Sequence, residues 1–151
     1  MSEHGAIIKK LQLKDQSKPV LIINGPKEYD ETITFEAEVH KEVRLDSYPF
    51  VQVFGSSNEE IQSHAREGLK VLEEDGLLWL CYPKKSSKKY KGSNCSRETV
   101  AGLLADEGFE PVRQIAIDED WSALRFRPVD KIKKMTRKNA VTEKGKERIV
   151  E

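Results

Sequence analysis

A short segment near the middle of the chain concentrates side chains that could bind an anion. Residues 84–91 include five lysines and no acidic residue, and a helix-start signal follows at Ser96. Lysine ammonium groups suit phosphate, serine hydroxyls add hydrogen-bond donors, and the first N–H groups of a helix attract anions. The residues predicted to contact such a ligand are Lys84, Lys85, Ser86, Ser87, Lys88, Lys89 and Ser96.

This lysine-rich segment (residues 84–91) allows three interpretations. It could hold a phosphate-bearing small molecule, it could contact the backbone of a nucleic acid, or it could be a solvated loop that binds nothing. The Gly-x-x-x-x-Gly-Lys-Ser/Thr pattern of a P-loop is absent from the chain. The segment is therefore not predicted to be a P-loop nucleotide site.

A second group of residues, between 118 and 125, could support catalysis. Asp118 and Asp120 could bind a metal ion or act as acid and base, with Trp121 and Arg125 close by in the sequence. The same residues also fit a structural role, because aspartate favours tight turns and a tryptophan at a strand start often packs on the core. We favour the structural role and keep an enzyme of unknown class as an alternative.

The spacing of cysteines and histidines predicts neither a metal site nor a catalytic thiol. No histidine lies between Cys81 and Cys95, and the three histidines, at positions 4, 40 and 64, are scattered along the chain. Cys81 belongs to a hydrophobic run and is expected to be inert. Cys95 lies close to the lysines and to a helix start, surroundings that are expected to lower its pKa.

The first hydrophobic run ends in a turn that is poorly suited to a cofactor. Enzymes that bind a dinucleotide or S-adenosylmethionine need a glycine-rich turn after their first strand. Here the turn is Asn24-Gly25-Pro26, with one glycine followed by proline. No cofactor is therefore predicted.

Apolar periodicity predicts the elements that would position these residues. A helix is expected from Asn58 to Asp75, ended by Gly76, with Gly68 allowing close approach to a sheet. A second helix is expected between Ser96 and Gly108. Alternating or continuous apolar runs predict strands at residues 20–23, 32–39, 50–54, 77–82, 112–117 and 121–128.

The order of these elements indicates the fold class. Strand–helix–strand units favour a parallel sheet with crossover helices, and the last two strands should close the sheet as an antiparallel hairpin. We predict a small three-layer α/β domain with a mixed sheet, Rossmann-like or similar to a truncated methyltransferase fold. Open sheets of this kind bind ligands outside the carboxyl ends of their strands, where the lysine-rich segment is expected.

Length and charge distribution predict one domain with a basic tail. The chain has 151 residues, enough for one core, and a formal net charge of zero. Residues 131–148 hold eight basic and two acidic residues, without an aromatic residue that could stack on bases. We expect a partly docked polar segment at 1–18, an α/β domain at 19–129 and a mobile basic tail at 130–151.

Several absences favour a cytoplasmic protein without membrane contact. No apolar run approaches the roughly 20 residues that cross a bilayer. The first residues lack the basic and then apolar layout of a signal peptide. Two cysteines do not make a disulfide framework, so a reducing compartment is expected.

Three segments carry a resemblance to known sequences: residues 21–26 (LIINGP), 79–84 (WLCYPK) and 118–127 (DEDWSALRFR). Together they resemble a family of small bacterial proteins known only as a domain of unknown function. The resemblance covers roughly residues 8–129. It implies a compact bacterial cytoplasmic domain, and it supplies no activity and no catalytic residue.

These observations favour a non-catalytic protein that binds a phosphate-bearing ligand at the lysine-rich segment. One alternative is a nucleic-acid-associated protein that uses this segment together with the basic tail. The other is an enzyme that uses Asp118, Asp120 and Arg125, which requires these side chains to converge on a pocket together with the lysine-rich segment.

Overall fold

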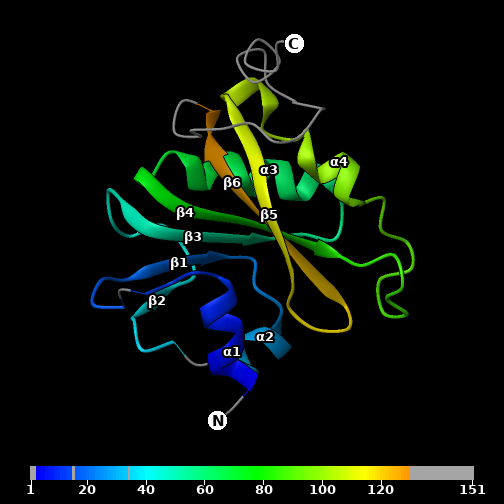
Figure 1. Ribbon diagram of the computed structural model, residues 1–151, viewed down its shortest axis with the longest axis horizontal. Helices are drawn as coiled ribbons and strands as arrows, with labels where there is room; N and C mark the ends of the chain where they lie inside the picture. The colour runs from blue at the N-terminus through cyan, green and yellow to red at the C-terminus, as the bar shows by residue number, and fades with distance from the viewer. Residues whose placement is uncertain (1–2, 15, 34, 130–151) are drawn as a thin grey trace.

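One mixed β-sheet organises the protein. The computed structural model describes residues 3–14, 16–33 and 35–129, and in this part of the chain six strands pair in the order β2-β1-β3-β4-β6-β5 (Figure 1). Strands β2, β1, β3 and β4 are parallel, whereas β6 runs antiparallel to both β4 and β5. The strands are β1 (Val20–Ile23), β2 (Val39–His40), β3 (Tyr48–Phe54), β4 (Leu72–Pro83), β5 (Phe109–Ala116) and β6 (Trp121–Pro128).

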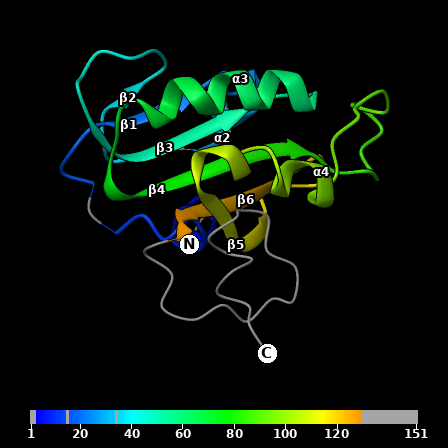
Figure 2. The same cartoon turned by 90° about the horizontal axis from the view of Figure 1, so that it is seen from above.

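Helices cover both faces of this sheet, as Figure 2 shows from above. Helices α1 (Glu3–Lys10) and α2 (Lys27–Thr32) contribute to the core cluster on one face. Helices α3 (Asn58–Leu69) and α4 (Arg97–Ala101) contribute to the cluster on the other. The predicted three-layer α/β architecture with a closing antiparallel hairpin is therefore confirmed.

Strand β4 lies at the centre of the sheet and has little contact with solvent. Residues 78–81 are fully buried, because one side of the strand faces α3 and the other faces the α1 layer. This confirms the interpretation of the apolar run as a central strand covered on both faces. The strand is longer than predicted, since it begins at Leu72.

Helix α3 ends earlier than the apolar spacing predicts. The expectation of a helix that continues to Asp75 and stops at Gly76 is wrong, since α3 ends at Leu69. The chain turns there because the carbonyl of Val71 accepts a hydrogen bond from the backbone N–H of Tyr48 (2.7 Å), which pairs this segment with the start of β3. Gly76 instead lies within β4, where a Cβ atom would approach the carbonyl oxygen of Pro49 to 3.2 Å.

The predicted strand at residues 32–39 is also wrong over most of its length. Only Val39 and His40 pair with β1. The side chain of Gln16 accepts hydrogen bonds from the backbone N–H groups of Glu36 (2.7 Å) and Ala37 (3.3 Å), which replaces a strand partner there. The apolar residues of this segment alternate because they pack on the core. The backbone of most of the segment does not pair with a neighbouring strand.

The segment between Ser96 and Gly108 is helical only at its two ends. Helix α4 spans five residues, and a 3₁₀-helix, η1 (Ala105–Glu107), follows after a turn. Gly108 ends η1 with a left-handed backbone (φ 78°), a conformation that favours glycine. Strand β5 then begins at once with Phe109, three residues before its predicted start at 112.

The N-terminal segment docks on the sheet through its apolar side chains. Ile8, Leu11 and Leu13 are buried in the α1-side core, and the indole N–H of Trp79 donates to the Leu11 carbonyl (3.0 Å). Among the described helices, none is both long and apolar enough to cross a membrane. The predicted basic tail at 130–151 lies outside the described residues.

Candidate anion-binding site

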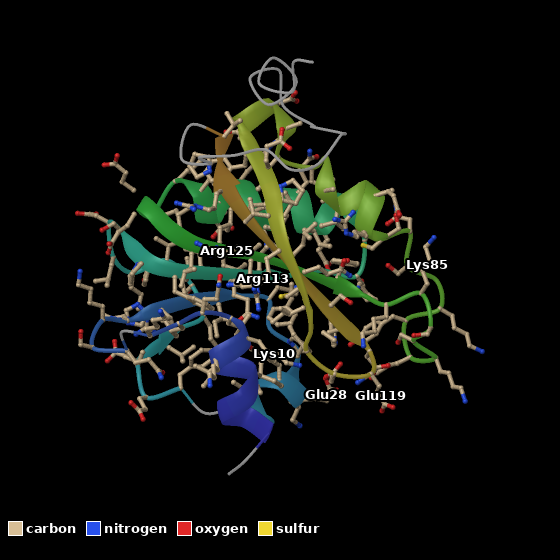
Figure 3. All side chains as sticks on the ribbon, in the orientation of Figure 1. Lys10, Glu28, Lys85, Arg113, Glu119 and Arg125 are labelled. Atoms are coloured by element: carbon tan, nitrogen blue, oxygen red, sulfur yellow. The ribbon has the colours of Figure 1, made fainter. Side chains whose placement is uncertain are left out.

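The lysine-rich segment connects the carboxyl end of β4 to the start of α4. The backbone N–H of Lys84 donates to the carbonyl of Asp120 (2.8 Å), which holds the segment against the β5–β6 turn. Farther along, Lys89 pairs with Glu28 of α2 at 2.5 Å between Nζ and Oε1. In Figure 3, Lys85 projects from the edge of the sheet, on the same side of the molecule as Glu119 of that turn.

Two of the predicted ligand-binding serines are used by the fold. The buried hydroxyl of Ser87 donates to Asp120 Oδ1 (2.8 Å) and accepts from the backbone N–H of Tyr90 (3.2 Å). Ser96 caps α4: its hydroxyl accepts from the N–H of Thr99 (3.2 Å), whose own hydroxyl accepts from the N–H of Ser96 (2.9 Å). The helix start is thus satisfied by its own capping box, so the lysines are the main source of attraction for an anion.

Lysines converge on a small cavity at this end of the sheet. Its volume is about 280 Å³, and the residues that line it are Pro83, Lys84, Lys85, Tyr90, Lys91, Ser93, Asn94, Cys95 and Ser96. Among the residues that the structure describes, the lining contains three lysines and no acidic residue. Lys88 and Lys89, although predicted as ligand contacts, are not among the lining residues.

A second cavity shares Lys84 and Lys85 with the first. It has a volume of about 470 Å³ and is lined in addition by Ser86, Arg97 and the acidic Glu98. Because Glu98 would repel an anion, the smaller cavity next to Lys91 is the better candidate for anion binding.

Asn94 fixes the far side of the smaller cavity. Its side-chain oxygen accepts from the backbone N–H of Asn58 at the start of α3 (2.9 Å), and its carbonyl accepts from the Asn58 side chain (3.1 Å). Its side-chain amide also donates to Glu59 (3.0 Å). Asn94 and Lys91 were not among the predicted site residues, because nothing in the local sequence indicates that α3 packs against this loop.

Lys89 of the lysine-rich segment forms an ion pair with Glu28 of α2. The hydrogen bond between Lys89 and Glu28 raises the pKa of the ammonium and lowers the pKa of the carboxyl. Both groups are exposed, so the pair contributes little to folding stability. Lys89 is therefore held by α2, away from the cavity.

The acidic turn and Arg125 do not form one site. Asp118 Oδ1 accepts from the N–H groups of Asp120 and Trp121 (both 2.8 Å), so the carboxylate stabilises the hairpin turn. Trp121 is buried in the core. Arg125 lies in the middle of β6 and donates to Gln12 on the α1 side, and Figure 3 shows it well away from Glu119 of the turn. The convergence that the enzyme hypothesis requires is absent.

The two cysteines are both free and buried. Burial raises the pKa of Cys81, whose sulfur accepts a hydrogen bond from Gln52 (3.3 Å). Burial also raises the pKa of Cys95, so the expectation of a lowered pKa there is wrong. In the described part of the chain, no three His, Cys, Asp or Glu side chains come together in a way that could hold a metal ion.

The switch point of the sheet, between the carboxyl ends of β1 and β3, is bridged by side chains. Asn24 donates to the carbonyl of Phe54 (3.0 Å) and to Glu60 Oε1 (3.3 Å), which also accepts from the N–H of Ser56 (2.9 Å). Asn24 adopts a left-handed backbone (φ 60°), which asparagine tolerates better than most residues. The side chains thus connect the turns after the two strands.

Four aromatic rings continue this bridge along the carboxyl edge. Tyr29 packs on Phe54 with 4.8 Å between ring centroids, Phe54 packs on Trp121 at 5.2 Å, and Trp121 packs on Tyr90 at 4.9 Å. The row links α2, β3, β6 and the lysine-rich segment.

Comparison with known proteins defines the fold but not a family. No protein-family model matches the chain, and no curated protein matches it. The chain is similar to the crystal structure of a SAM dependent methyltransferase from Aquifex aeolicus, with a TM-score of 0.55 and 11% identity over 82% of this chain and 88% of that one. It is less similar to a protein of the NADB-Rossmann superfamily from Streptococcus agalactiae, with a TM-score of 0.46 and 11% identity over 85% of this chain and 68% of that one.

At this level of identity the likeness to the methyltransferase concerns the fold alone. It agrees with the predicted Rossmann-like or truncated methyltransferase-like architecture. The resemblance to a bacterial family of unknown function remains a prediction, since no family model matches the chain.

Proposed function

We propose that this protein is a non-catalytic binding protein for a phosphate-bearing anion, held in the small cavity at the carboxyl end of β4. The observation that carries the proposal is the presence of Lys84, Lys85 and Lys91 around one cavity, with no acidic residue in the part of its lining that the structure describes. Ammonium groups bind phosphate as point charges. The fold directs such ligands to the carboxyl ends of its strands.

The size of the cavity limits what it can enclose. Its volume of about 280 Å³ is slightly below the range of roughly 300–1,000 Å³ that is usual for whole small-molecule sites. We therefore expect the phosphate group to be enclosed, while the rest of the ligand lies outside. Ser93 could donate its hydroxyl hydrogen to the phosphate, whereas the side chain of Asn94 is already bonded to Asn58 and Glu59.

The residues at the switch point fit a methyl donor of the SAM type poorly. The turn after β1 has one glycine, and Pro26 at the N-cap of α2 has no backbone N–H to offer a ligand. Asn24 and Glu60 are hydrogen-bonded to each other across the place where a cofactor would lie. We therefore assign no methyl transfer to this protein and look for its ligand one strand farther along the sheet, at β4.

The free cysteines and the sequence resemblance support a cytoplasmic, bacterial protein as part of this proposal. Thiols that stay unpaired are typical of reducing compartments. The alternative of nucleic-acid association rests on the basic tail, and its test is given in the Discussion.

Two variants with equal charge change test the proposal. Lys84→Gln/Lys91→Gln removes two cations from the cavity lining, whereas Lys88→Gln/Lys89→Gln removes two cations of the same segment outside it. Calorimetric titration with inorganic phosphate and pyrophosphate at low salt should show binding that is at least roughly tenfold weaker in the first variant, because a charge-assisted contact contributes about 1.5–3 kcal/mol. The second variant should bind as the unmodified protein does. Equal affinities in both variants, or no binding by the unmodified protein, would contradict the proposal.

A further inference from the structure

The cavity that contains Glu98 adjoins the smaller cavity to which we assign the phosphate. The two cavities share the lining residues Pro83, Lys84, Lys85 and Ser96. In Figure 3, Lys85 marks this place at the edge of the molecule. The larger cavity has a volume of about 470 Å³, within the range of roughly 300–1,000 Å³ that is usual for small-molecule sites. A ligand with its phosphate in the smaller cavity can therefore extend into the larger one.

One face of the sheet forms the floor of this larger cavity. Tyr82 of β4 is the register partner of Ser122 in β6, so the two side chains leave the same face. Gln114 of β5 has Leu124 as register partner, two residues beyond Ser122, and therefore lies on that face as well. The floor thus consists of three polar side chains, one from each of three neighbouring strands.

Two hydroxyl groups of the floor are available to a ligand. Ser122 is only 6% exposed, and in the described part of the chain its hydroxyl has no hydrogen-bond partner. Tyr82 is 3% exposed, and its hydroxyl accepts a hydrogen bond from the side-chain amide of Gln114 (3.1 Å). Burial raises the pKa of Tyr82 to about 12, so the hydroxyl keeps its proton and can donate it to a ligand oxygen. A ligand that bonds with both hydroxyls supplies partners that the described residues do not.

The wall of the larger cavity combines a hydrogen-bond acceptor with donors. Glu98 has its pKa lowered by hydrogen bonds with its own backbone N–H and with Ser96, so it is a carboxylate and only accepts. Lys85 and Arg97 only donate. An alcohol group both donates and accepts, so a ligand with several hydroxyls matches this mixture. A second phosphate would be repelled by Glu98.

The larger cavity has little apolar surface for a flat aromatic group. In the part of its lining that the structure describes, only Pro83 lacks a polar side-chain group. The ring of Tyr82 is buried, so it is not available for stacking on a base. The lining therefore favours a hydroxyl-rich group over a nucleobase.

We propose that the two cavities together bind a sugar phosphate, that is, a phosphate monoester of a compound with several hydroxyl groups. This inference rests on the proposed function and names the class of its ligand. Lys84 and Lys91 attract the phosphate in the smaller cavity. The sugar hydroxyls exchange hydrogen bonds with Tyr82, Ser122 and Glu98 in the larger one.

A pair of matched ligands tests the sugar part of this assignment. Glucose 6-phosphate and cyclohexylmethyl phosphate carry the same phosphate on a six-membered ring, with and without hydroxyl groups. Calorimetric titration of the full chain at low salt should show that glucose 6-phosphate binds roughly tenfold more tightly, because it adds several neutral hydrogen bonds. Equal affinity for the two monoesters would overturn the assignment of a sugar.

A variant without the two hydroxyls tests the place at which the sugar binds. Tyr82→Phe/Ser122→Ala removes two oxygen atoms and no charge, and its affinity for glucose 6-phosphate should fall roughly tenfold. Its affinity for inorganic phosphate and for cyclohexylmethyl phosphate should not change. Ser63→Ala removes an exposed hydroxyl of α3, outside both cavities, and should bind all three ligands as the unmodified protein does. Melting temperatures show whether each variant is folded, and Ser122→Ala alone replaces the double variant if that one is not.

The outcomes separate this inference from the proposed function. Lys84→Gln/Lys91→Gln should weaken the binding of all three ligands. Unchanged affinity for glucose 6-phosphate in the hydroxyl variant would overturn the sugar site, while the phosphate site would stand. Weaker glucose 6-phosphate binding in the hydroxyl variant with unchanged binding in the lysine variant would instead overturn the placement of the phosphate. Absence of binding of all three ligands by the unmodified protein would overturn both.

Discussion

At the residue scale, a chain of hydrogen bonds runs through the buried part of the sheet. The hydroxyl of Tyr29 donates to Gln52 Oε1 (2.8 Å), and Gln52 Nε2 donates to the sulfur of Cys81 (3.3 Å). Gln52 is fully buried. Because a buried polar group without a partner is costly, these contacts constrain how α2 can dock on β3 and β4.

Replacing Gln52 with leucine should therefore destabilise the protein. The change keeps the volume but removes the acceptor of the Tyr29 hydroxyl, with an expected loss of about 1–3 kcal/mol in the free energy of unfolding. Urea denaturation measures this loss. The double variant Gln52→Leu/Tyr29→Phe should recover part of it, and a double variant as unstable as the sum of the two single changes would contradict the explanation.

Both thiols should react slowly in the folded protein. Burial raises the pKa of Cys81 and of Cys95, so little thiolate exists at neutral pH, and the sulfur atoms are shielded. Titration with Ellman's reagent at pH 7.5 should give a slow reaction in buffer and a rapid reaction of two thiols in guanidinium chloride. Rapid reaction of Cys95 in the folded protein would show that the loop opens readily.

At the element scale, helix α3 approaches strand β3 closely at Gly68. A Cβ atom on Gly68 would lie 2.8 Å from Cγ1 of Val51, too close for a side chain without movement of the helix. This agrees with the predicted reason for a glycine in this helix. A matched position exists at Gly102, where an added Cβ would find its nearest neighbour at 4.0 Å.

Gly68→Ala and Gly102→Ala should consequently have opposite effects. The first should lower the free energy of unfolding by about 1–3 kcal/mol through overpacking. The second should be neutral or stabilising by up to about 1 kcal/mol, because the backbone at Gly102 is right-handed and alanine restricts the unfolded chain. Thermal melting of both variants tests this contrast, and equal effects would contradict it.

The cap of α4 can be separated from ligand binding by one substitution. Ser96→Ala removes the hydroxyl that accepts from Thr99 and should cost about 1 kcal/mol of stability. If Ser96 acts as a cap, the affinity for phosphate should change less than in Lys84→Gln/Lys91→Gln. A large loss of phosphate affinity without loss of stability would instead make Ser96 a ligand contact.

At the scale of the whole molecule, charge is distributed unevenly around a net charge of zero. Basic side chains gather around the small cavity at the carboxyl end of β4 and around a second cavity between α1 and β5, whose lining includes Lys9, Lys10, Lys14 and Arg113. The sheet order places the first at the carboxyl end of the central strand and the second over the closing hairpin. The net charge of zero therefore conceals two local concentrations of positive charge.

The alternative function is nucleic-acid association, in which the lysine-rich segment and the basic residues of 131–151 contact the phosphate backbone. It predicts that the logarithm of the affinity for a mixed-sequence single strand falls linearly with the logarithm of the salt concentration. The slope should be about −0.7 for each phosphate contact. Deletion of residues 131–151 should then make this dependence shallower. Failure of the intact chain to bind the strand at about 50 mM salt, a concentration at which backbone contacts are strong, would remove this alternative.

Most strands and the closing hairpin could be predicted from the sequence, because they depend on local patterns. The apolar run at 77–82, the alternation at 121–128 and the turn at Asp118 each determine their own backbone preference. The C-terminal end of α3 and the segment at 32–39 could not be predicted, since the turn at Val71 depends on Tyr48 and the backbone at Glu36 depends on Gln16. Such partners are distant in sequence.

The sequence by itself determined the layered α/β fold and the position of concentrated lysines after the central strand. Only the tertiary structure decided which of these lysines surround a cavity, that Ser87 and Ser96 serve the fold, and that Arg125 faces α1 rather than the acidic turn. The physical reason is the range of the interactions involved. Secondary structure follows from neighbouring residues, whereas a binding site follows from the packing of elements that are far apart in the chain.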